Sequence, residues 1–233
     1  MARVLPDAEA PGGPRRVRAA HVRWRGEFQL APGAGWRPFT AEQRFTVSPP
    51  GFVWDAAINM LPVVGRLVPM RVRDHYLGGE GAMLGRFGGV VPVVHATGTP
   101  ELAASALARW LGEAAWFPQA LLPGGPVTWE AVDDSTARAI VTDGAVQVRA
   151  DFHFAPTGEM TRMTAMRYRD VDGRGVLTPF EGRYGAYVRR GGVLVPGESE
   201  VAWLLPEGRF PYWRGRALEV VLTNDPAPSD TRR

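Results

Sequence analysis

Hydrophobic and polar residues alternate with a period of two along most of the chain. The clearest case is segment 145–154, whose apolar positions are Val146, Val148, Ala150, Phe152 and Phe154. The polar residues between them would face water, which is typical of an antiparallel strand with one buried face. Residues 20–30 repeat the pattern, with Trp24 on the apolar side. Weaker segments follow at 36–47, 52–60, 68–77, 81–87, 127–132, 136–142, 159–169, 176–190, 193–204 and 216–223. Turn signals separate them, so the pattern predicts about ten to twelve short strands joined mainly as hairpins.

Residues 100–117 interrupt this alternation and predict one long helix. Thr99 can cap the first turn, and Pro100 suits the first helical position. Pro118 disfavours helical geometry at Phe117, so the helix should end there. A single apolar stripe runs along it, formed by Leu107, Trp110, Leu111 and Ala114.

The predicted fold class is mostly β, an antiparallel half-barrel of about ten to twelve strands wrapped around this helix. Wrapping buries the apolar stripe and the dry face of the sheet together. The alternative is a flat sandwich with the helix outside. We expect residues 16–224 to form a single domain, with a flexible segment at 1–15 and a disordered tail at 225–233. The aromatic and aliphatic residues expected on the concave side are Trp24, Trp54, Tyr76, Val148, Phe152 and Trp203.

Composition narrows the possible chemistry. The 233 residues include no Cys, which excludes disulfides, thiolate zinc sites and cysteine nucleophiles. The net charge is +3, and all 27 basic residues are Arg, mostly scattered among acidic residues. Such scattering argues against a nucleic-acid surface. The histidines lack a third ligand nearby, and nucleotide-binding loops are absent, so we expect neither a metal site nor a cofactor.

Targeting signals are also missing from the sequence. The N-terminal residues lack the apolar stretch of a signal peptide, and no apolar run approaches the length of a membrane span. We therefore expect a cytoplasmic protein with no membrane span. Its oligomeric state is not predicted.

Glu113 is the first candidate for chemistry, because this carboxylate lies between Trp110 and Trp116 on the predicted helix. Burial beside the sheet would raise its pKa and make it a usable general acid or base. Two plainer interpretations remain open. One is an exposed ion pair with Arg109, four residues away. The other is a buried pair with a group from the sheet, for which Arg214 and Tyr212 are the expected partners.

Asp74 is the second candidate. The alternation in "LVPMRVRDHYL" turns Asp74 inward beside Tyr76 and leaves His75 outward. An inward carboxylate is costly unless it is paired. Asp74 is therefore either a catalytic group or a structural one satisfied by an arginine or a turn amide.

Aromatic residues are the candidates for ligand binding. The stretch "FPYWRG" at 210–215 combines stacking surfaces with a cationic group. The expected ligand-binding residues are Trp24, Trp54, Tyr76, Trp110, Trp116, Phe152, Trp203, Tyr212 and Arg214. Core packing is the alternative role for each ring.

Three motifs carry a resemblance to a known family. "GFVWDA", "GEAAWFPQALL" and "FPYWRG" resemble an uncharacterised family of bacterial proteins, a domain of unknown function, over about residues 16–224. The order of strands and helix also resembles the lipoprotein-localisation-factor fold. That second resemblance implies a half-barrel with a helix across its mouth, a frame that holds acyl chains.

These patterns lead to three hypotheses about function. The preferred one is the binding of a small apolar or amphipathic molecule between the curved sheet and the helix. The first alternative is a cofactor-free isomerase, cyclase or hydrolase with Glu113 or Asp74 as general acid or base. The second alternative is a structural or protein-binding module. An enzyme needs a carboxylate poised near neutrality beside open volume, whereas a carrier needs only the volume.

Overall fold

The computed structural model describes residues 17–63, 66–190 and 192–223. The flexible segment and the tail expected at 1–15 and 225–233 lie outside this part of the chain. The single-domain assignment stays a prediction.

Antiparallel strands make up most of the described chain. They are β1 (Ala19–Phe28), β2 (Arg37–Thr46), β3 (Gly51–Val63), β4 (Arg66–Leu77), β5 (Glu80–Phe87), β6 (Val91–Thr97), β7 (Val127–Asp133), β8 (Thr136–Asp143), β9 (Val146–Phe154), β10 (Met160–Val171), β11 (Arg174–Gly185), β12 (Val188–Arg190), β13 (Val193–Val195), β14 (Glu198–Leu205) and β15 (Gly208–Thr223). The sheet has 13 strands in the order β6-β5-β4-β3-β2-β1-β15-β14-β11-β10-β9-β8-β7, and β12 and β13 form a separate ribbon. Strand β6 lies where the sequence predicts none.

Helix α1 (Pro100–Glu113) forms where the alternation stops. The Thr99 hydroxyl accepts a hydrogen bond from the Leu102 amide at 3.1 Å, as an N-cap should. After Glu113 the chain tightens into the 3₁₀ turns η1 (Ala114–Trp116) and η2 (Pro118–Leu121). The helical conformation stops at Phe117 (φ −136°, ψ 64°), as expected for the residue before Pro118.

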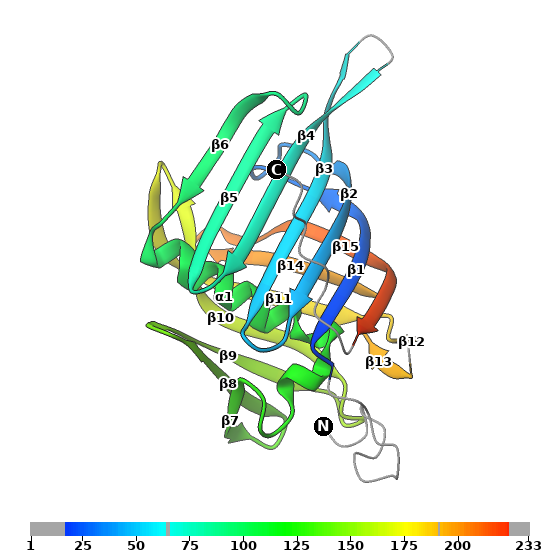
Figure 1. The fold of residues 1–233 in the computed structure, drawn as a ribbon, viewed down its shortest axis with the longest axis vertical. Coiled ribbons are helices and arrows are strands. Elements are labelled where there is room, and N and C mark those ends of the chain that lie inside the picture. Colours follow the sequence, from blue (N-terminus) through cyan, green and yellow to red (C-terminus); the bar gives the residue numbers. More distant parts are fainter. Residues whose placement is uncertain (1–16, 64–65, 191, 224–233) are drawn as a thin grey trace.

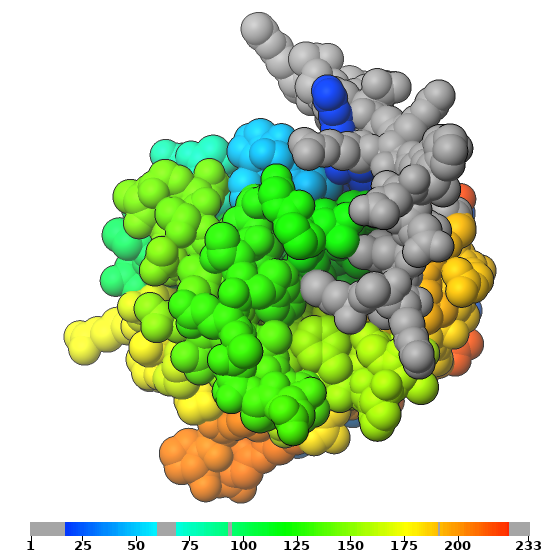
Figure 2. Space-filling view, turned by 90° about the horizontal axis from the view of Figure 1, so that it is seen from below, coloured from blue at the N-terminus to red at the C-terminus, as the bar shows by residue number. Residues whose placement is uncertain are grey.

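The sheet curves around α1, which confirms the predicted half-barrel. The helix packs against β5 on one arm of the sheet and against β9 and β10 on the other. Figure 1 shows α1 lying across the concave side, and Figure 2 shows the segment after the helix filling the middle of the lower end of the molecule. The apolar stripe of α1 and the dry face of the sheet therefore form one core.

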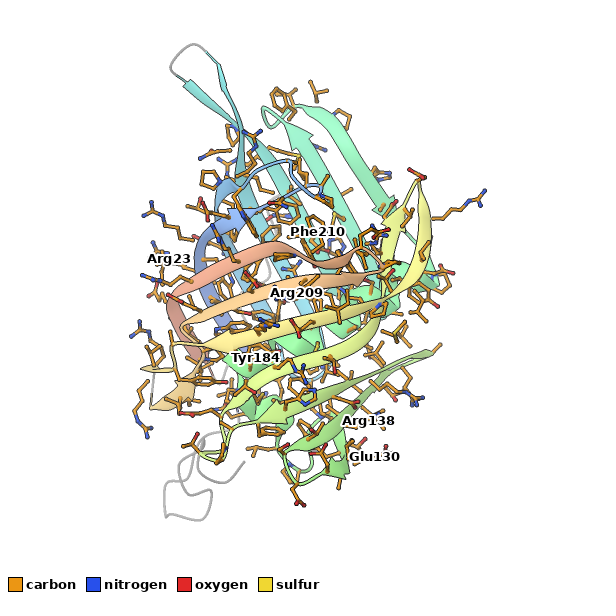
Figure 3. All side chains as sticks on the ribbon, turned by 180° about the vertical axis from the view of Figure 1, so that it is seen from behind. Arg23, Glu130, Arg138, Tyr184, Arg209 and Phe210 are labelled. Atoms are coloured by element: carbon orange, nitrogen blue, oxygen red, sulfur yellow. The ribbon has the colours of Figure 1, made fainter. Side chains whose placement is uncertain are left out.

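The two arms of the sheet are tied together across the helix. The Tyr76 hydroxyl, on β4, donates to Asp143 Oδ2 at 2.8 Å, at the tip of the β8–β9 hairpin. To reach it, β9 leaves its neighbour β10. The two strands pair only between Met160–Thr164 and Asp151–Phe154. Beyond that point they diverge (Figure 3).

Candidate functional site

A cavity of about 220 Å³ lies between α1 and the concave face of the sheet. Its wall is mainly apolar and includes Ile58, Met70, Val72, Met83, Met163 and Phe180. These side chains come from β3, β4, β5, β10 and β11. The volume is below the roughly 300–1,000 Å³ of pockets that hold drug-sized ligands, so the space suits a small molecule or a short apolar chain.

Two glycines shape this cavity. A Cβ atom at Gly112 would lie 2.6 Å from Met163 Cε, so glycine lets the helix approach β10 closely. A Cβ at Gly182 would make only ordinary contacts, 3.7 Å from the Tyr184 hydroxyl and 3.8 Å from Val201 Cγ1. Gly182 therefore leaves open volume that a side chain would occupy.

Two carboxylates and one guanidinium form the polar part of the wall. Arg109 donates from Nε to Glu113 Oε1 at 3.0 Å and from Nη1 to Asp74 Oδ2. The side chains of Arg109, Glu113 and Asp74 are only 16, 17 and 6 % exposed. The helix and β4 thus contribute to one buried ionic cluster at the edge of the apolar space.

The sheet supports this cluster on the opposite side of Glu113. Gln43 Nε2 donates to Glu113 Oε2 at 2.6 Å, and Trp24 Nε1 donates to Gln43 Oε1 at 3.0 Å. The Arg109 guanidinium also lies over the rings of Phe52 and Trp54, at 4.9 and 5.0 Å from their centroids. Its position is therefore held by charge, hydrogen bonds and cation–π contacts together.

Burial sets the charge balance of the cluster. It raises the pKa of the Glu113 carboxyl, and this effect outweighs the opposing influence of Arg109, Gln43 and Arg167. Burial alone would lower the pKa of the Arg109 guanidinium, but the two carboxylates outweigh it and raise that pKa. Arg109 accordingly stays charged, while Glu113 holds its proton to a higher pH than an ordinary glutamic acid.

A second arginine, Arg167 on β10, also faces the cavity. Its Nε donates to the carbonyl oxygen and the hydroxyl of Ser105 on α1, both at 3.0 Å. Its Nη1 donates to the Tyr212 hydroxyl at 3.3 Å. Among the ion pairs of the described residues, none involves Arg167.

Five of the residues predicted for the site line this cavity: Asp74, Glu113, Trp54, Trp116 and Tyr212. The structure brings Asp74 and Glu113 together through Arg109. Trp24, Tyr76, Trp110, Phe152 and Trp203 are buried but lie outside the lining. Their binding role stays a prediction, and packing accounts for their burial.

The expected pairing of Glu113 with Arg214 or Tyr212 is wrong. Arg214 lies on the convex face, where it is paired with Glu27 and stacked on Trp36. The phenol of Tyr212 contacts Arg167 instead. Helix and sheet register place Arg109 and Gln43 nearer to the Glu113 carboxylate than either expected partner.

Three polar residues of the site were absent from the predicted set: Arg109 as a cavity residue, Gln43 and Arg167. Each could have been noticed from the alternation or the helical spacing. Gln43 falls between Ala41 and Phe45 on the inward side of β2, and a polar residue there is the same signal that identified Asp74.

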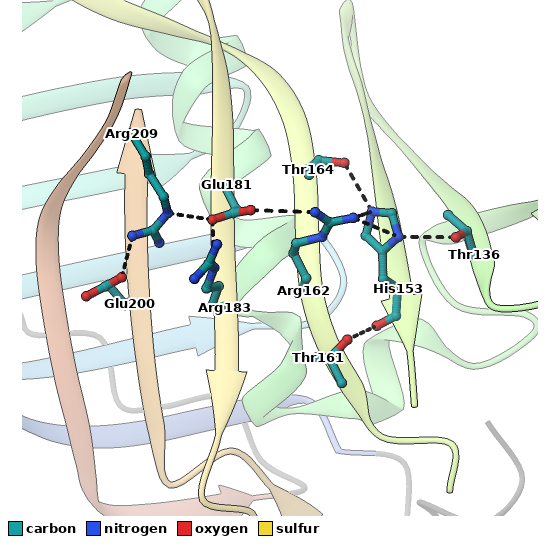
Figure 4. Close-up of polar contacts among 9 residues, drawn as sticks. All are labelled: Thr136, His153, Thr161, Arg162, Thr164, Glu181, Arg183, Glu200 and Arg209. Carbon is teal, nitrogen blue, oxygen red and sulfur yellow. Dashed lines mark hydrogen bonds and ion pairs between the residues drawn. The ribbon is translucent and has the colours of Figure 1, made fainter. Parts of the chain in front are cut away.

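The outer face of the sheet carries a separate polar cluster (Figure 4). Glu181 accepts hydrogen bonds from Arg183 at 2.8 Å and Arg209 at 2.7 Å. These bonds outweigh the effect of burial and lower the pKa of the Glu181 carboxyl. The cluster pairs its own charges and lies on the opposite side of the sheet from the cavity.

Other kinds of site find no support in the part of the chain that the structure describes. No group of three His, Cys, Asp or Glu side chains there could hold a metal ion. The helix found in that part is neither long nor apolar enough to cross a membrane.

Comparison with known proteins places the chain in a family. Residues 5–221 match the model of a family of unknown function, DUF6920, so the chain belongs to that family. No curated protein matches the sequence.

Three solved structures resemble this chain at low sequence identity. A domain described as an outer membrane lipoprotein-sorting protein, from Vibrio parahaemolyticus, has a TM-score of 0.51 and 8% identity, with 91% of this chain and 88% of that one covered. A LolA superfamily protein from Nitrosomonas europaea has a TM-score of 0.46 and 12% identity, with 91% and 89% covered. A DUF1329 family protein from Desulfovibrio piger has a TM-score of 0.47 and 9% identity, with 88% and 86% covered.

The cytoplasmic location predicted from the sequence is contradicted by this comparison. The Vibrio protein is described as an outer membrane lipoprotein-sorting protein, a description that does not fit a cytoplasmic location.

Proposed function

We propose that this member of a family of unknown function binds a small apolar or amphipathic molecule in the cavity between α1 and the concave sheet. One observation carries the proposal. The half-barrel encloses an apolar cavity of about 220 Å³ with a few convergent polar side chains, where a packed core would leave no such space.

The polar wall favours an amphipathic ligand over a purely apolar one. Asp74, Arg109, Glu113 and Arg167 all line the same cavity as the methionines and Phe180. Water alone would satisfy these groups if the space were filled with solvent, yet the apolar surface beside them gains from contact with an apolar chain. A ligand with an apolar body and a polar end satisfies both parts of the wall.

A cavity-filling substitution tests the proposal. Gly182→Val adds a side chain into the open volume, on a strand where valine is favoured. The probe is N-phenylnaphthylamine, whose fluorescence rises in apolar surroundings. We expect the wild type to bind it and Gly182→Val to bind it at least about tenfold more weakly, a loss of roughly 1.4 kcal/mol.

The matched control is Gly185→Val, on the same strand. A Cβ there meets nothing within 4 Å, and Gly185 is not part of the cavity lining. Its affinity should stay within about twofold of the wild type. Equal affinities of Gly182→Val and the wild type would mean that the probe does not occupy the cavity, and the proposal would fail.

A second candidate function is acid–base catalysis on the bound molecule, with Glu113 as the proton-transfer group. The observation that favours it is a carboxyl of raised pKa at the wall of the cavity. The test is to incubate the ligand that co-purifies in native mass spectrometry with the wild type and with Glu113→Gln. Product formed by the wild type alone supports an enzyme, and unchanged ligand in both samples supports a carrier.

A further inference from the structure

Strands β9 and β10 diverge beyond the pair Asp151–Thr164, and the gap between them, called the fork here, opens toward the cavity. The last paired residues are Asp151 on β9 and Thr164 on β10. From there β9 continues toward Asp143, which accepts the hydrogen bond from Tyr76, while β10 stays paired with β11. Figure 3 shows the β8–β9 hairpin running away from β10. The space between the two strands is a groove of about 600 Å³ with Ala104 of α1 among its lining residues.

The groove has an apolar side, formed by residues of β10, β11 and β14, and reaches the cavity wall. Met166 and Leu177, which are exposed, lie along it with Pro179 and Leu204. Arg167 and Phe180 line both the groove and the 220 Å³ cavity. The Arg167 guanidinium lies 5.0 Å from the centre of the Phe180 ring. These two side chains therefore form the partition between the open groove and the enclosed space.

Arg167 is the cation at this junction that makes no direct ion pair within the described part of the chain. Arg109 is engaged by Glu113 and Asp74, but the direct contacts of Arg167 among the described residues are to the neutral oxygens of Ser105 and Tyr212. Its charge acts on Glu113 without a direct ion pair. Its Nη2 makes no hydrogen bond within the described part of the chain. A planar guanidinium with a free edge is suited to grip a carboxylate or another acidic group.

We propose that Arg167 binds the acidic headgroup of an amphiphile whose apolar tail occupies the cavity, and that the ligand reaches it through the fork between β9 and β10. This inference rests on the proposed function and specifies its ligand class. The competing chemistry is an alkylamine held by Glu113 and Asp74. Those carboxylates already pair directly with Arg109, whereas Arg167 makes no direct ion pair and acts on Glu113 only from beyond contact distance.

The experiment displaces N-phenylnaphthylamine with three molecules that share one tail: decanoate, decanol and decylamine, all below their micellar concentrations. The wild type should prefer decanoate to decanol by about tenfold, a difference of roughly 1.4 kcal/mol. Arg167→Gln should abolish this preference, so that decanoate and decanol displace N-phenylnaphthylamine equally well from that variant. Arg167→Lys, which keeps the charge but not the planar guanidinium, should retain part of this preference.

The matched control is Arg149→Gln, which removes the same charge from the β9 side of the groove. It should keep the full preference for decanoate. The inference is overturned if the wild type binds decanoate and decanol equally, if it prefers decylamine, or if Arg149→Gln and Arg167→Gln lose the preference equally. Failure of N-phenylnaphthylamine itself to bind would instead overturn the proposed function, and this inference with it.

Discussion

Glu113 illustrates how a buried charge can be well bonded without stabilising the fold. It accepts two hydrogen bonds, from Arg109 and Gln43, yet burial raises the pKa of its carboxyl. A raised pKa means that the folded protein disfavours the ionised form relative to water. The hydrogen bonds therefore contribute to the free energy of unfolding, while the negative charge itself contributes no net stability.

Substitutions at position 113 should separate these two contributions. Glu113→Gln keeps the shape and one acceptor, so its free energy of unfolding at neutral pH should stay within about 1 kcal/mol of the wild type. Glu113→Ala leaves Gln43 Nε2 and Arg109 Nε without an acceptor, and should cost about 1–3 kcal/mol. Urea denaturation measures both. Glu219→Gln, in an exposed pair with Arg23, is the control and should change stability by less than about 0.5 kcal/mol.

The same substitution changes the pH dependence in a defined direction. Between the unfolded pKa of 4.5 and the higher folded pKa, the folded state holds the Glu113 proton and the unfolded state releases it. The contribution of Glu113 to stability therefore falls as pH rises through this window. The difference in unfolding free energy between wild type and Glu113→Gln should show this decline. A difference that rises with pH in the same window would contradict the raised pKa.

At the scale of elements, the large sheet loses pairing where β9 diverges from β10. Each strand keeps one partner, β8 for β9 and β11 for β10, so the fork costs ladder hydrogen bonds on one side only. Ser105 on the helix recovers one of them, because its hydroxyl donates to the Tyr168 carbonyl at 2.9 Å. Helix packing thus stabilises an opening in the sheet.

Closing the fork should slow the entry of ligand. Ala150 and Ala165 are the first residues of the two strands beyond the paired segment, and both line the groove. Because the chain has no Cys, the double variant Ala150→Cys/Ala165→Cys gives a single possible disulfide. Oxidation should reduce the rate of N-phenylnaphthylamine association, measured by stopped flow, by about tenfold or more, and dithiothreitol should restore it.

The control joins two strands that are already paired, through Arg71→Cys/Arg86→Cys on β4 and β5. Its association rate should not depend on oxidation. An oxidised fork variant that binds as fast as its reduced form would show that the ligand enters elsewhere.

At the scale of the whole molecule, the hydrogen bond between Tyr76 and Asp143 is a latch that joins the two arms of the half-barrel across the helix. Tyr76 and Asp143 belong to opposite arms of the sheet, 67 residues apart. Burial raises the pKa of the Tyr76 phenol, and the hydrogen bond to Asp143 adds to that effect, so the hydroxyl stays a donor throughout the physiological range.

Removal of this latch should loosen one arm and leave the other unchanged. Tyr76→Phe should lower the free energy of unfolding by about 1 kcal/mol, the usual value of one such bond. Hydrogen exchange should accelerate in β8 and β9 and remain unchanged in β1 and β2. Tyr168→Phe is the control, because the Tyr168 hydroxyl makes no hydrogen bond among the described residues. Uniform acceleration across all strands would argue against a local latch.

Interactions between residues close in sequence explain which features could be predicted from the sequence alone. Alternation in 20–30 and 145–154 identified two strands and their buried faces, since side chains of a strand point to opposite sides with a period of two. Thr99, Pro100 and Pro118 set the ends of the helical segment, because capping and proline geometry act within one turn. These same rules placed Asp74 on the inward side of β4.

Only the tertiary structure decided which inward groups meet. Gln43 and Glu113 are 70 residues apart, and Asp74 and Arg109 are 35 apart, so no spacing rule relates them. Their contacts depend on how strongly the sheet curves and on where the helix lies across it. The fork depends on the same curvature, because β9 must leave β10 to reach Tyr76 on the far arm. Periodicity determines the face of each side chain, whereas the closure of the sheet determines its partners.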